Sequence, residues 1–535
     1  MPAKKSSKWI IISGGVLSGL GKGIVTASIG KLLSSDYKVV PVKCDGYLNV
    51  DPGTMNPFEH GEVFVLEDGG EVDMDFGHYE RFLNINCKFD WNLTSGKVFS
   101  SVIEKERRGD YLGKTVQIIP HVVNQVKQEF YEIARKEKAE IMLIELGGTV
   151  GDIENMIFYE AVRQLKLEVG PNNLIYVHLT YVPVLHSVGE QKTKPTQQST
   201  ALLREAGIQP DVIIGRSNNS LTKKSKQKIA LFCNINEGDV ISDPNTESVY
   251  ELPLVFEKEG LTKSILKKLN LKRKRDLKKW NMLVEKIKHP KHKVNIAICG
   301  KYTDLHDSYV SILESLIHAG ANLGTKVNLS WIETTEIEQG KINVSDVLTG
   351  VNGVIIPGGF GHRGAEGKIE VIRYLRENNI PFLGLCFGLQ LAVVEFARNV
   401  CGIEDANSTE VDAKTAHPVI FIMPEQEKVT NKGATMRLGS QKAMLKKGSL
   451  VQKLYKSDVA FERHRHRYEV NPKYHDMLQK NGMIFSGMSP DKQLVEFIEL
   501  PKHKYFVATQ GHPELKSRLE RPAPLFYGFV KACVS

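Results

Sequence analysis

A cysteine between two glycines, at the junction of an expected strand and an expected helix, constrains the fold of this chain most. The apolar stretch 380–385 has the character of a short buried strand that leads directly into Cys386, and 388–394 has the pattern of a helix start. A strand-to-helix turn of this kind exposes one nucleophile, and the glycines at 384 and 388 permit the sharp bend. The helix N-terminus favours the thiolate, which is the reactive form of cysteine. The sequence therefore predicts an α/β domain that carries a nucleophilic cysteine.

A motif far downstream offers partners for this cysteine. His512 and Glu514 lie in the sequence Gly511-His512-Pro513-Glu514. We expect His512 to act as the base and Glu514 to orient it, as in the cysteine form of a catalytic triad. The alternative interpretation is a buried structural cysteine and an unrelated turn, and the glycines on both sides of Cys386 favour the triad.

Length and composition indicate a globular protein of more than one domain. The 535 residues are too many for one hydrophobic core, so two or three domains are expected. The seven cysteines are scattered without metal-type pairing, which predicts a reducing, cytoplasmic location. The apolar run 9–12 is too short for a signal peptide or a membrane span, so no membrane partner is expected. The formal net charge of +9 would suit nucleic acid or small anionic substrates such as nucleotides.

Much of the positive charge lies between residues 258 and 293. A nucleic-acid patch is one interpretation of this segment. However, Trp280 is the only Phe, Trp or Tyr interleaved with its basic residues, so a solvated helix between two domains is favoured and no nucleic-acid partner is expected. A new apolar strand follows the segment. We therefore place a first domain at 1–275, a basic linker at 276–293 and a second domain at 294–535.

The first domain begins with the order of elements that a phosphate-binding loop requires. An apolar strand at 9–13 is followed by a glycine-rich loop at 14–23 and by a segment with helical apolar spacing at 24–33. In this order, main-chain amides at the helix start cradle phosphate groups. The match is imperfect, because one extra residue separates the two key glycines and Gly23 replaces the magnesium-binding Ser or Thr. A structural turn is the alternative for this loop taken alone.

Other segments favour nucleotide binding. Glu145 ends an apolar strand, where α/β sheets place metal and phosphate chemistry, and the stretch 71–75 adds carboxylates. Magnesium commonly takes one or two carboxylates together with phosphate oxygens. In the loop 189–197, Lys192 and Lys194 would point the same way in an extended chain, which suits a triphosphate. Strands that alternate with helical patterns predict a largely parallel sheet.

Together these segments resemble the CTP synthase family. The resemblance rests on the cysteine elbow and on loops at 14–23, 49–55, 73–81, 105–115, 147–154 and 189–197, and the strings Glu104–Gly113 and Arg463–Glu469 are specific to that family. It extends from about residue 9 to residue 531. It implies an α/β fold of two domains, each a mostly parallel sheet flanked by helices. The first would be a P-loop amidoligase similar to dethiobiotin synthetase, and the second a class I glutamine amidotransferase.

For the second domain, the resemblance implies hydrolysis of L-glutamine by Cys386, His512 and Glu514. The nucleophile would attack the side-chain amide of glutamine, and a main-chain amide at Gly359 would stabilise the oxyanion. The residues that would hold glutamine are Gly359, Phe387, Gly388, Leu389, Gln390, Glu410 and Arg467.

For the first domain, the resemblance implies a ligase that makes CTP from UTP. ATP would phosphorylate O4 of UTP, and ammonia from the glutamine site would displace the phosphate at C4. The ATP-binding residues would be Gly19, Leu20, Gly21, Lys22, Gly23, Ile24, Lys43 and Asp75, and the ligands of Mg²⁺ would be Asp75 and Glu145. The residues in contact with UTP, or with CTP as a feedback inhibitor, would be Ser18, Asp152, Ile153, Glu154, Lys192, Thr193, Lys194, Pro195, Thr196, Gln197 and Lys228.

The resemblance also implies regulation and assembly. GTP would activate the enzyme by binding near Arg363, Thr435 and Arg437, and the chain would form a homotetramer and, as in some members, filaments. Four positions depart from the family pattern without removing a catalytic side chain: Gly46, Ile157, Ala434 and Gly511. Two other functions stay open, namely another ATP-dependent glutamine amidotransferase similar to a cobyrinate amidase, and a non-catalytic nucleotide-binding scaffold that polymerises.

Overall fold

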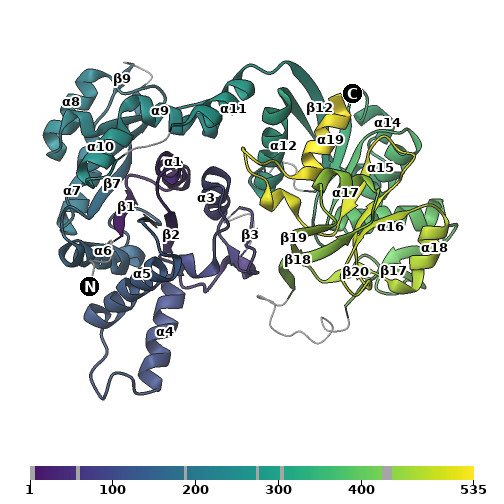
Figure 1. Ribbon diagram of the computed structural model, residues 1–535, viewed down its shortest axis with the longest axis horizontal. Coiled ribbons are helices and arrows are strands. Elements are labelled where there is room, and N and C mark those ends of the chain that lie inside the picture. The colour runs from purple at the N-terminus through teal and green to yellow at the C-terminus, as the bar shows by residue number, and fades with distance from the viewer. Residues whose placement is uncertain are drawn as a thin grey trace. The chain divides into compact units, whose positions relative to one another are not determined.

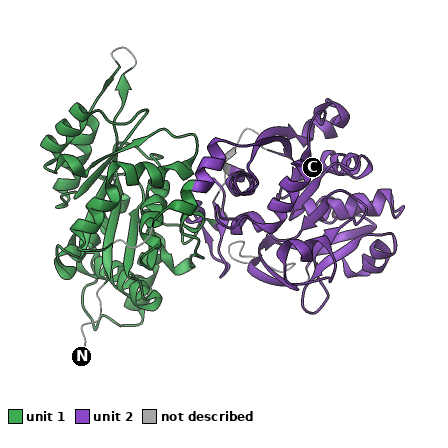
Figure 2. Ribbon diagram, turned by 45° about the horizontal axis from the view of Figure 1, so that its top comes forward, with its two compact units in different colours: residues 1–52, 78–281 green, residues 53–77, 282–535 purple. Residues whose placement is uncertain are grey.

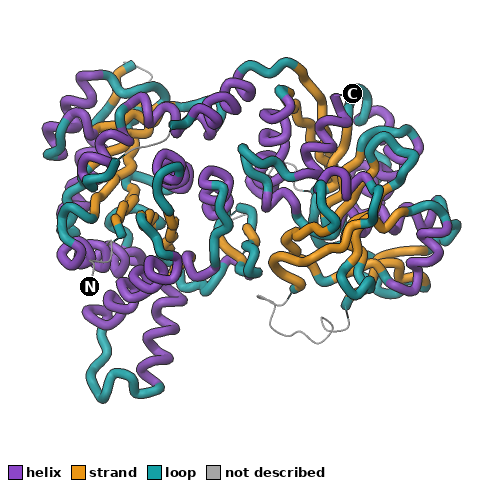
Figure 3. The backbone as a smooth tube through the Cα atoms, viewed as in Figure 1, coloured by secondary structure: helices purple, strands orange, loops and turns teal. Residues whose placement is uncertain are grey.

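The computed structural model describes residues 7–55, 61–185, 189–272, 276–301, 306–423 and 436–534 (Figure 1). The chain divides into two compact units, one made of Met1–Pro52 and His78–Asn281 and the other of Gly53–Gly77 and Met282–Ser535 (Figure 2). Each unit is a sheet flanked by helices (Figure 3), so the predicted two-domain α/β fold is confirmed. Among the helices that the structure describes, none is both long and apolar enough to cross a lipid bilayer.

The first unit is built on a seven-stranded sheet in which all neighbouring strands are parallel. From one edge to the other the strands are β11 (Val240–Pro244), β10 (Val212–Ser217), β7 (Leu174–Tyr181), β1 (Lys8–Gly14), β6 (Ile141–Leu146), β2 (Val39–Asp45) and β5 (Asn92–Thr94). The four central strands are buried almost from end to end, as expected where helices cover both faces. Because the strands share one direction, the carboxyl ends of β1, β2 and β6 meet at one edge of the sheet.

Helices and short loops complete the first unit. The helices are α1 (Lys22–Ser34), α3 (Asp75–Leu83, whose first residues belong to the second unit), α4 (Ser95–Arg107), α5 (Val123–Glu137), α6 (Met156–Val169), α7 (Lys194–Glu205), α8 (Lys223–Cys233), α9 (Leu252–Glu259), α10 (Leu261–Lys268) and α11 (Lys278–Lys288, whose last residues belong to the second unit). A small antiparallel pair, β8 (Val184–Leu185) with β9 (Glu190–Gln191), precedes α7. The loops that follow β1, β6 and β10 therefore open on the same edge as the strand ends.

The second unit contains a nine-stranded sheet that is parallel in one half and antiparallel in the other. Its strands in order are β13 (Thr325–Glu333), β12 (His292–Gly300), β14 (Gly353–Ile356), β15 (Phe382–Leu385), β23 (Phe506–Thr509), β22 (Val495–Glu499), β21 (Ile484–Met488), β18 (Arg437–Leu445) and β19 (Val459–His466). A three-stranded sheet contains β16 (Ala406–Ser408), β17 (His417–Ile422) and β20 (Tyr468–Val470). The helices are α12 (Val310–Leu323), α13 (Thr334–Glu338), α14 (Val344–Val347), α15 (Ala365–Glu377), α16 (Phe387–Asn399), α17 (Leu450–Tyr455), α18 (His475–Lys480) and α19 (Pro524–Val534).

A short stretch from the N-terminal half belongs to the second unit. This stretch, Gly53–Gly77, includes the antiparallel pair β3 (Phe64–Val65) and β4 (Glu71–Val72). Oε1 of Glu67 lies 3.3 Å from Nε of Arg463, and Oε1 of Glu71 lies 2.8 Å from Nε of Arg465. The division differs from the predicted boundaries, which assigned the whole N-terminal half to one domain. Residues 53–77 join the second unit through long-range contacts, such as the pair of Glu67 and Arg463, which lie 396 positions apart in the sequence.

The predicted linker, 276–293, contains α11, and the start of this helix packs on the first unit. Trp280 is 1% exposed, and its indole N–H donates to the carbonyl of Tyr250 at 2.8 Å. Its ring also packs against that of Phe82. Leu283 and Val284 are buried as well, so apolar residues at i, i+3 and i+4 form one face of a helix whose other positions carry the lysines. The segment is therefore an amphipathic structural helix and not a fully solvated connector.

The substitution Trp280→Ala is expected to lower the free energy of unfolding by about 3–5 kcal/mol, because it removes a large buried ring and leaves a cavity. Met282→Ala on the same helix is the matched control, since its side chain is 56% exposed, and it should cost no more than about 0.5 kcal/mol. Urea unfolding followed by circular dichroism measures both. Equal costs for the two variants would contradict the packing role of Trp280.

Candidate active site

Cys386 lies in a sharp turn between β15 and α16, as the sequence predicts. Its φ of 49° and ψ of −99° are rare for a residue with a side chain. Its amide donates to the carbonyl of Thr509 on β23 at 2.7 Å. A Cβ at Gly388 would lie 2.3 Å from the carbonyl oxygen of Ile356, so only glycine lets the first turn of α16 pack against β14. The turn therefore places the sulfur at the carboxyl edge of the sheet and at the N-terminus of a helix.

The two predicted partners of this cysteine are assembled beside it. Nδ1 of His512 lies 2.7 Å from Oε1 of Glu514. A Cβ at Gly358 would be 3.0 Å from Cε1 of His512 and 3.6 Å from Cβ of Cys386, so both side chains border this glycine. Burial would lower the pKa of His512, but the Glu514 carboxylate and Cys386 raise it well above its ordinary value. The arrangement favours the protonated imidazolium form of His512.

A cavity of about 360 Å³ opens at this cysteine. Its lining includes Gly358, Gly359 and His512 on the side of the turn, and Glu62, Val63, Val65, Tyr309 and Arg465 around it. This volume suits a small ligand such as a free amino acid. Residues 62–65 were not predicted here, because no local pattern marks them as the wall of a site formed by the C-terminal half.

The predicted glutamine-binding residues next to Cys386 contribute mainly through the main chain. Gly359 lines the cavity. The first turn of α16 is formed by Phe387, Gly388 and Leu389, all of them buried. The amide of Leu389 donates to the carbonyl of Cys386 at 3.0 Å, whereas the amides of Phe387 and Gly388 lie at the very start of the helix, where N–H donors suit a developing negative charge.

The remaining members of the predicted glutamine set lie on three different segments. Nε2 of Gln390 donates to the carbonyl of Tyr468 at 3.0 Å, and this glutamine is 2% exposed. Oε1 of Glu410 accepts from the amide of Gly361 at 2.7 Å, and burial raises the pKa of its carboxyl. Arg467 is half-buried between β19 and β20. Glu410 thus holds the loop that contains Gly359.

In the first unit, the glycine-rich loop surrounds the start of α1. Gly19 and Gly21 have φ of 74° and 91°, which residues with a side chain rarely adopt. Nζ of Lys22 donates to the carbonyl of Gly148 at 2.6 Å, so the loop after β1 meets the loop after β6. Leu20 and Gly23 are buried in this turn. The loop thus has a strand before it and a helix after it, as predicted, and phosphate binding by its amides stays a prediction.

Lys43 and Glu145 are buried neighbours at the carboxyl ends of β2 and β6. Nζ of Lys43 lies 3.9 Å from Oε1 of Glu145, and the hydroxyl of Tyr79 donates to Oε2 at 2.5 Å. Asp75, the other predicted magnesium ligand, is the first residue of α3 and belongs to the second unit. In the described part of the chain, no group of three or more His, Cys, Asp or Glu could hold a metal by itself.

A second cavity, of about 480 Å³, adjoins the glycine-rich loop. Leu17, Gly19, Leu20, Gly21 and Ile24 line one part of it, and Tyr181, Arg216, Asp243, Thr246, Val249 and Leu252 line the rest. Nη1 of Arg216 lies 2.8 Å from Oδ1 of Asp243, and burial raises the pKa of Asp243 to about 6. This pair was not predicted from the sequence. Both residues stand near the carboxyl ends of β10 and β11, so the strand-end rule applied to every strand would have found them.

The predicted UTP-binding residues lie in two loops of the first unit. In the loop after β6, Asp152 accepts from the amide and the hydroxyl of Thr149 at 2.7 and 2.8 Å, and the following Ile153 is 82% exposed. The second group, 192–197, spans the start of α7, where Thr193 and Thr196 are buried. Ser18 and Lys228 are exposed.

The predicted GTP-binding residues have unlike surroundings. Arg363 is exposed, and its Nε donates to the hydroxyl of Thr335 at 3.4 Å. Thr435 lies outside the described residues. Arg437 is partly buried between two carboxylates, at 2.8 Å from Glu469 and 2.6 Å from Glu496. The guanidinium of Arg437 is thus occupied within the fold, and a contact with GTP stays a prediction.

Packing accounts for two of the four departures from the family pattern. A Cβ at Gly46 would lie 2.5 Å from Oδ1 of Asn155, and one at Gly511 would lie 2.8 Å from Cβ of Glu462, so neither position has room for a side chain. Ile157 is buried in α6, and nothing in the structure explains its choice. Ala434 lies outside the described residues.

Comparisons with known proteins agree with this geometry. The family model for the CTP synthase N-terminus matches residues 8–271, and that for class-I glutamine amidotransferase matches residues 304–532. The CTP synthase of Borreliella afzelii is 52% identical over 538 residues, which cover 99% of this chain and 100% of the relative. The CTP synthases of Pyrococcus abyssi and Methanococcus maripaludis are 55% and 52% identical, each over 98% of this chain and over 98% and 99% of their own lengths. The chain therefore belongs to the CTP synthase family and is a glutamine-hydrolysing ligase.

Proposed function

We propose that this chain aminates UTP at C4 to give CTP, with ATP as the co-substrate and ammonia released from L-glutamine. The observation that carries the proposal is the assembly of Cys386, His512 and Glu514 around a cavity of amino-acid size in a chain that also carries a phosphate-binding loop. One unit then supplies the nitrogen, and the other activates the nucleotide.

In the glutamine site, His512 takes the thiol proton of Cys386, and the sulfur attacks the side-chain carboxamide carbon. The amide of Gly359 and the first turn of α16 stabilise the oxyanion. When the C–N bond breaks, His512 returns the proton to the nitrogen, which leaves as ammonia. A water molecule activated by His512 then hydrolyses the thioester to glutamate. Glu514 keeps the imidazole oriented through both steps.

In the synthase site, Lys22 and the loop amides hold the phosphates of ATP, and Lys43 adds positive charge beside them. The γ-phosphoryl group passes to O4 of UTP, and ammonia then displaces inorganic phosphate at C4. Glu145 is a fit ligand for Mg²⁺, since it is a buried carboxylate at a strand end next to the phosphate loop, and Asp75 would be the second ligand. When bound, Mg²⁺ would neutralise charge on the transferred group.

The second cavity would take the nucleoside part of ATP, because it adjoins the glycine-rich loop. Asp152 to Glu154, Lys192 to Gln197, Ser18 and Lys228 would contact UTP, or CTP when it inhibits the enzyme. We further propose GTP activation near Arg363 and Thr435. Assembly into a homotetramer is supported by apolar side chains left exposed on the first unit, including Leu112 at 88% and Ile153 at 82%.

Replacing the nucleophile should separate the two half-reactions. For Cys386→Ala we expect glutamine-dependent CTP formation to fall by at least about 10³-fold, while the rate with ammonium chloride stays within about twofold, because only the glutamine step needs the sulfur. CTP is measured with UTP, ATP and Mg²⁺, with and without GTP, and Cys401→Ala is the control. If the unmodified chain makes no CTP from either nitrogen source, the proposed function is wrong.

The carboxyl of Asp243 should make ATP use sensitive to pH. Because burial raises its pKa to about 6, lowering the pH through that value protonates the group and releases Arg216. We expect the KM for ATP to rise about 3–10-fold between pH 7.5 and 5.5, with the KM for UTP much less affected, because a charged hydrogen bond is lost at the cavity wall.

Asp243→Asn should hold this elevated KM for ATP at every pH in that range. Glu237→Gln, an exposed carboxylate just before β11, is the control and should keep the pH dependence of the original chain. A KM for ATP that follows the same pH curve with and without Asp243 would contradict its role.

A further inference from the structure

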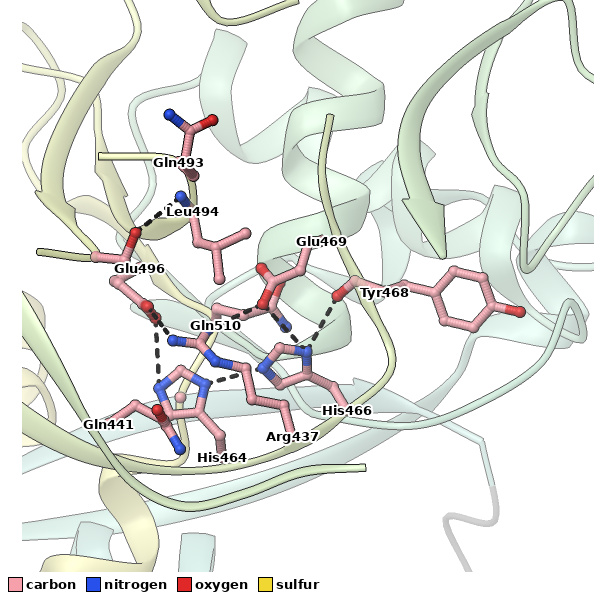
Figure 4. A network of polar contacts seen from close by, with 12 residues as sticks. Arg437, Gln441, His464, His466, Tyr468, Glu469, Gln493, Leu494, Glu496 and Gln510 are labelled. Atoms are coloured by element: carbon pink, nitrogen blue, oxygen red, sulfur yellow. Dashed lines mark hydrogen bonds and ion pairs between the residues drawn. The ribbon is translucent and has the colours of Figure 1, made fainter. Parts of the chain in front are cut away.

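Five ionisable side chains that the proposed reaction does not use form a largely buried polar network (Figure 4). The network lies next to the end of β23, the strand that precedes His512. They are Arg437 on β18, His464 and His466 on β19, Glu469 on β20 and Glu496 on β22. The two histidines are 2% exposed, and the glutamates are 0% and 1% exposed. Burying so many charged or polar groups is costly unless each finds a partner. The pairing therefore determines where protons lie.

Arg437 supplies the positive charge of the network. Nη1 lies 2.8 Å from Oε1 of Glu469, and Nη2 lies 2.6 Å from Oε1 of Glu496. One guanidinium thus faces two carboxyl groups that burial removes from water. Burial raises the pKa of both Glu469 and Glu496. Charge balance favours one ionised and one neutral carboxyl.

The hydrogen bonds of the two histidines identify the neutral carboxyl. Nδ1 of His466 lies 3.1 Å from the carbonyl of Tyr468, which can only accept, so Nδ1 carries a hydrogen and Nε2 of a neutral ring accepts. Nδ1 of His464, 2.9 Å away, must then donate to that Nε2. This leaves Nε2 of a neutral His464 as an acceptor, 3.4 Å from Oε2 of Glu496. Two acceptors would face each other unless a proton lies between them.

The proton belongs on Glu496. Burial lowers the pKa of His464 well below its ordinary value, with further lowering by Arg437, His466 and His512. A protonated Glu496 can donate to His464, while ionised Glu469 balances Arg437. Each member of the network then has a partner of the correct kind.

The network contacts the strand that carries the catalytic base. The amide of Gln510 donates to the carbonyl of Glu496 at 2.9 Å, and a Cβ at Gly511 would lie 3.2 Å from Nε2 of His464. The side chain of Gln510 reaches the nucleophile, with Nε2 3.6 Å from Sγ of Cys386. The backbone just before His512 is therefore packed directly against the Glu496–His464 pair.

A second route joins the network to the glutamine side of the cavity. Nε2 of Gln390 donates to the carbonyl of Tyr468 at 3.0 Å and lies 3.4 Å from Oε1 of Gln510. The same carbonyl of Tyr468 faces His466. Tyr468, which follows Arg467, and Gln510, which lies two residues before His512, are thus linked through the side chain of Gln390.

We propose that the proton held between Glu496 and His464 locks the segment that carries Gln510 and His512, which makes Glu496, His464 and Gln510 positioning residues for glutamine hydrolysis. This inference rests on the proposed function of Cys386 and His512. The charged groups that face the pair are Arg437 on β18, His466 on β19, Glu469 on β20, Asp491 after β21 and His512 after β23. Loss of the shared proton at alkaline pH leaves two acceptors opposed and loosens the segment.

Two substitutions of one residue test the shared proton. Glu496→Gln keeps the shape and supplies a permanent N–H donor to His464, so its glutamine-dependent kcat/KM should stay within about threefold of the original. Glu496→Leu removes the donor and should lower glutamine-dependent kcat/KM by about 30-fold or more, with the ammonium chloride reaction unchanged. Equal losses in both variants would overturn the proposal.

A pH profile separates positioning from general stability. The rate of alkylation of Cys386 by iodoacetamide, followed by mass spectrometry of its peptide from pH 6 to 9.5, should show an alkaline inflection in the original chain. That inflection should be absent in Glu496→Gln. Glu499→Gln is the matched control, because it is also a buried carboxylate on β22 but accepts from the amides of Leu450 and Val451; it should keep the inflection.

Different results would overturn the role of the shared proton and the proposed CTP-forming reaction. An unchanged inflection in Glu496→Gln, or its loss in Glu499→Gln as well, would overturn the role of the shared proton even if CTP is made. Absence of CTP formation in the original chain would overturn the proposed function, while the alkylation profile would still decide whether the pair positions Cys386. Alkylation needs neither UTP nor turnover, and its pH profile is compared between the original chain, Glu496→Gln and Glu499→Gln. The role of the shared proton can therefore be tested even if Glu496→Leu folds poorly.

Discussion

The hydrogen bond from the amide of Cys386 to the carbonyl of Thr509 is the contact on which the glutamine site depends. It ties the strained turn to β23, and only two residues lie between the end of that strand and His512. Because β15 and β23 are parallel neighbours, nucleophile and base emerge at the same edge of one sheet. The cost of a positive φ at the cysteine is offset by the packing of two fully buried strands.

In the first unit, too, parallel neighbouring strands bring polar side chains together at one edge of the sheet. Parallel pairing of β2 with β6 sets Lys43 opposite Glu145, and the loop after β1 delivers Lys22 to the carbonyl of Gly148. In the second unit Cys386 and His512 lie on turns at strand ends, whereas in the first unit Lys43 and Glu145 are buried residues near the carboxyl ends of β2 and β6.

Local patterns predicted the two turns because their geometry is encoded by neighbouring residues. Glycines around Cys386 and before Lys22 are needed for backbone angles and close packing that no other residue allows. Long-range pairs could not be predicted in this way, since nothing near Glu67 indicates that Arg463 will bind it. The lysines around Trp280 obscured an apolar helical face, and the Arg216–Asp243 pair depends on the order of β10 and β11 in the sheet. Arg437 was assigned from resemblance alone, and its two carboxylate neighbours come from strands far along the chain.

The placement of Gly53–Gly77 in the second unit has a consequence for the evolution and dissection of the gene. The polypeptide passes from one unit to the other three times, so the two units are not consecutive lengths of coding sequence. A truncated gene that starts after the basic segment would encode a glutamine site without the wall formed by Glu62, Val63 and Val65. Its product would also leave the guanidinium groups of Arg463 and Arg465 without their carboxylates. Recombination that exchanges the glutamine-hydrolysing half between relatives must therefore keep this small N-terminal insert matched to its distant partners.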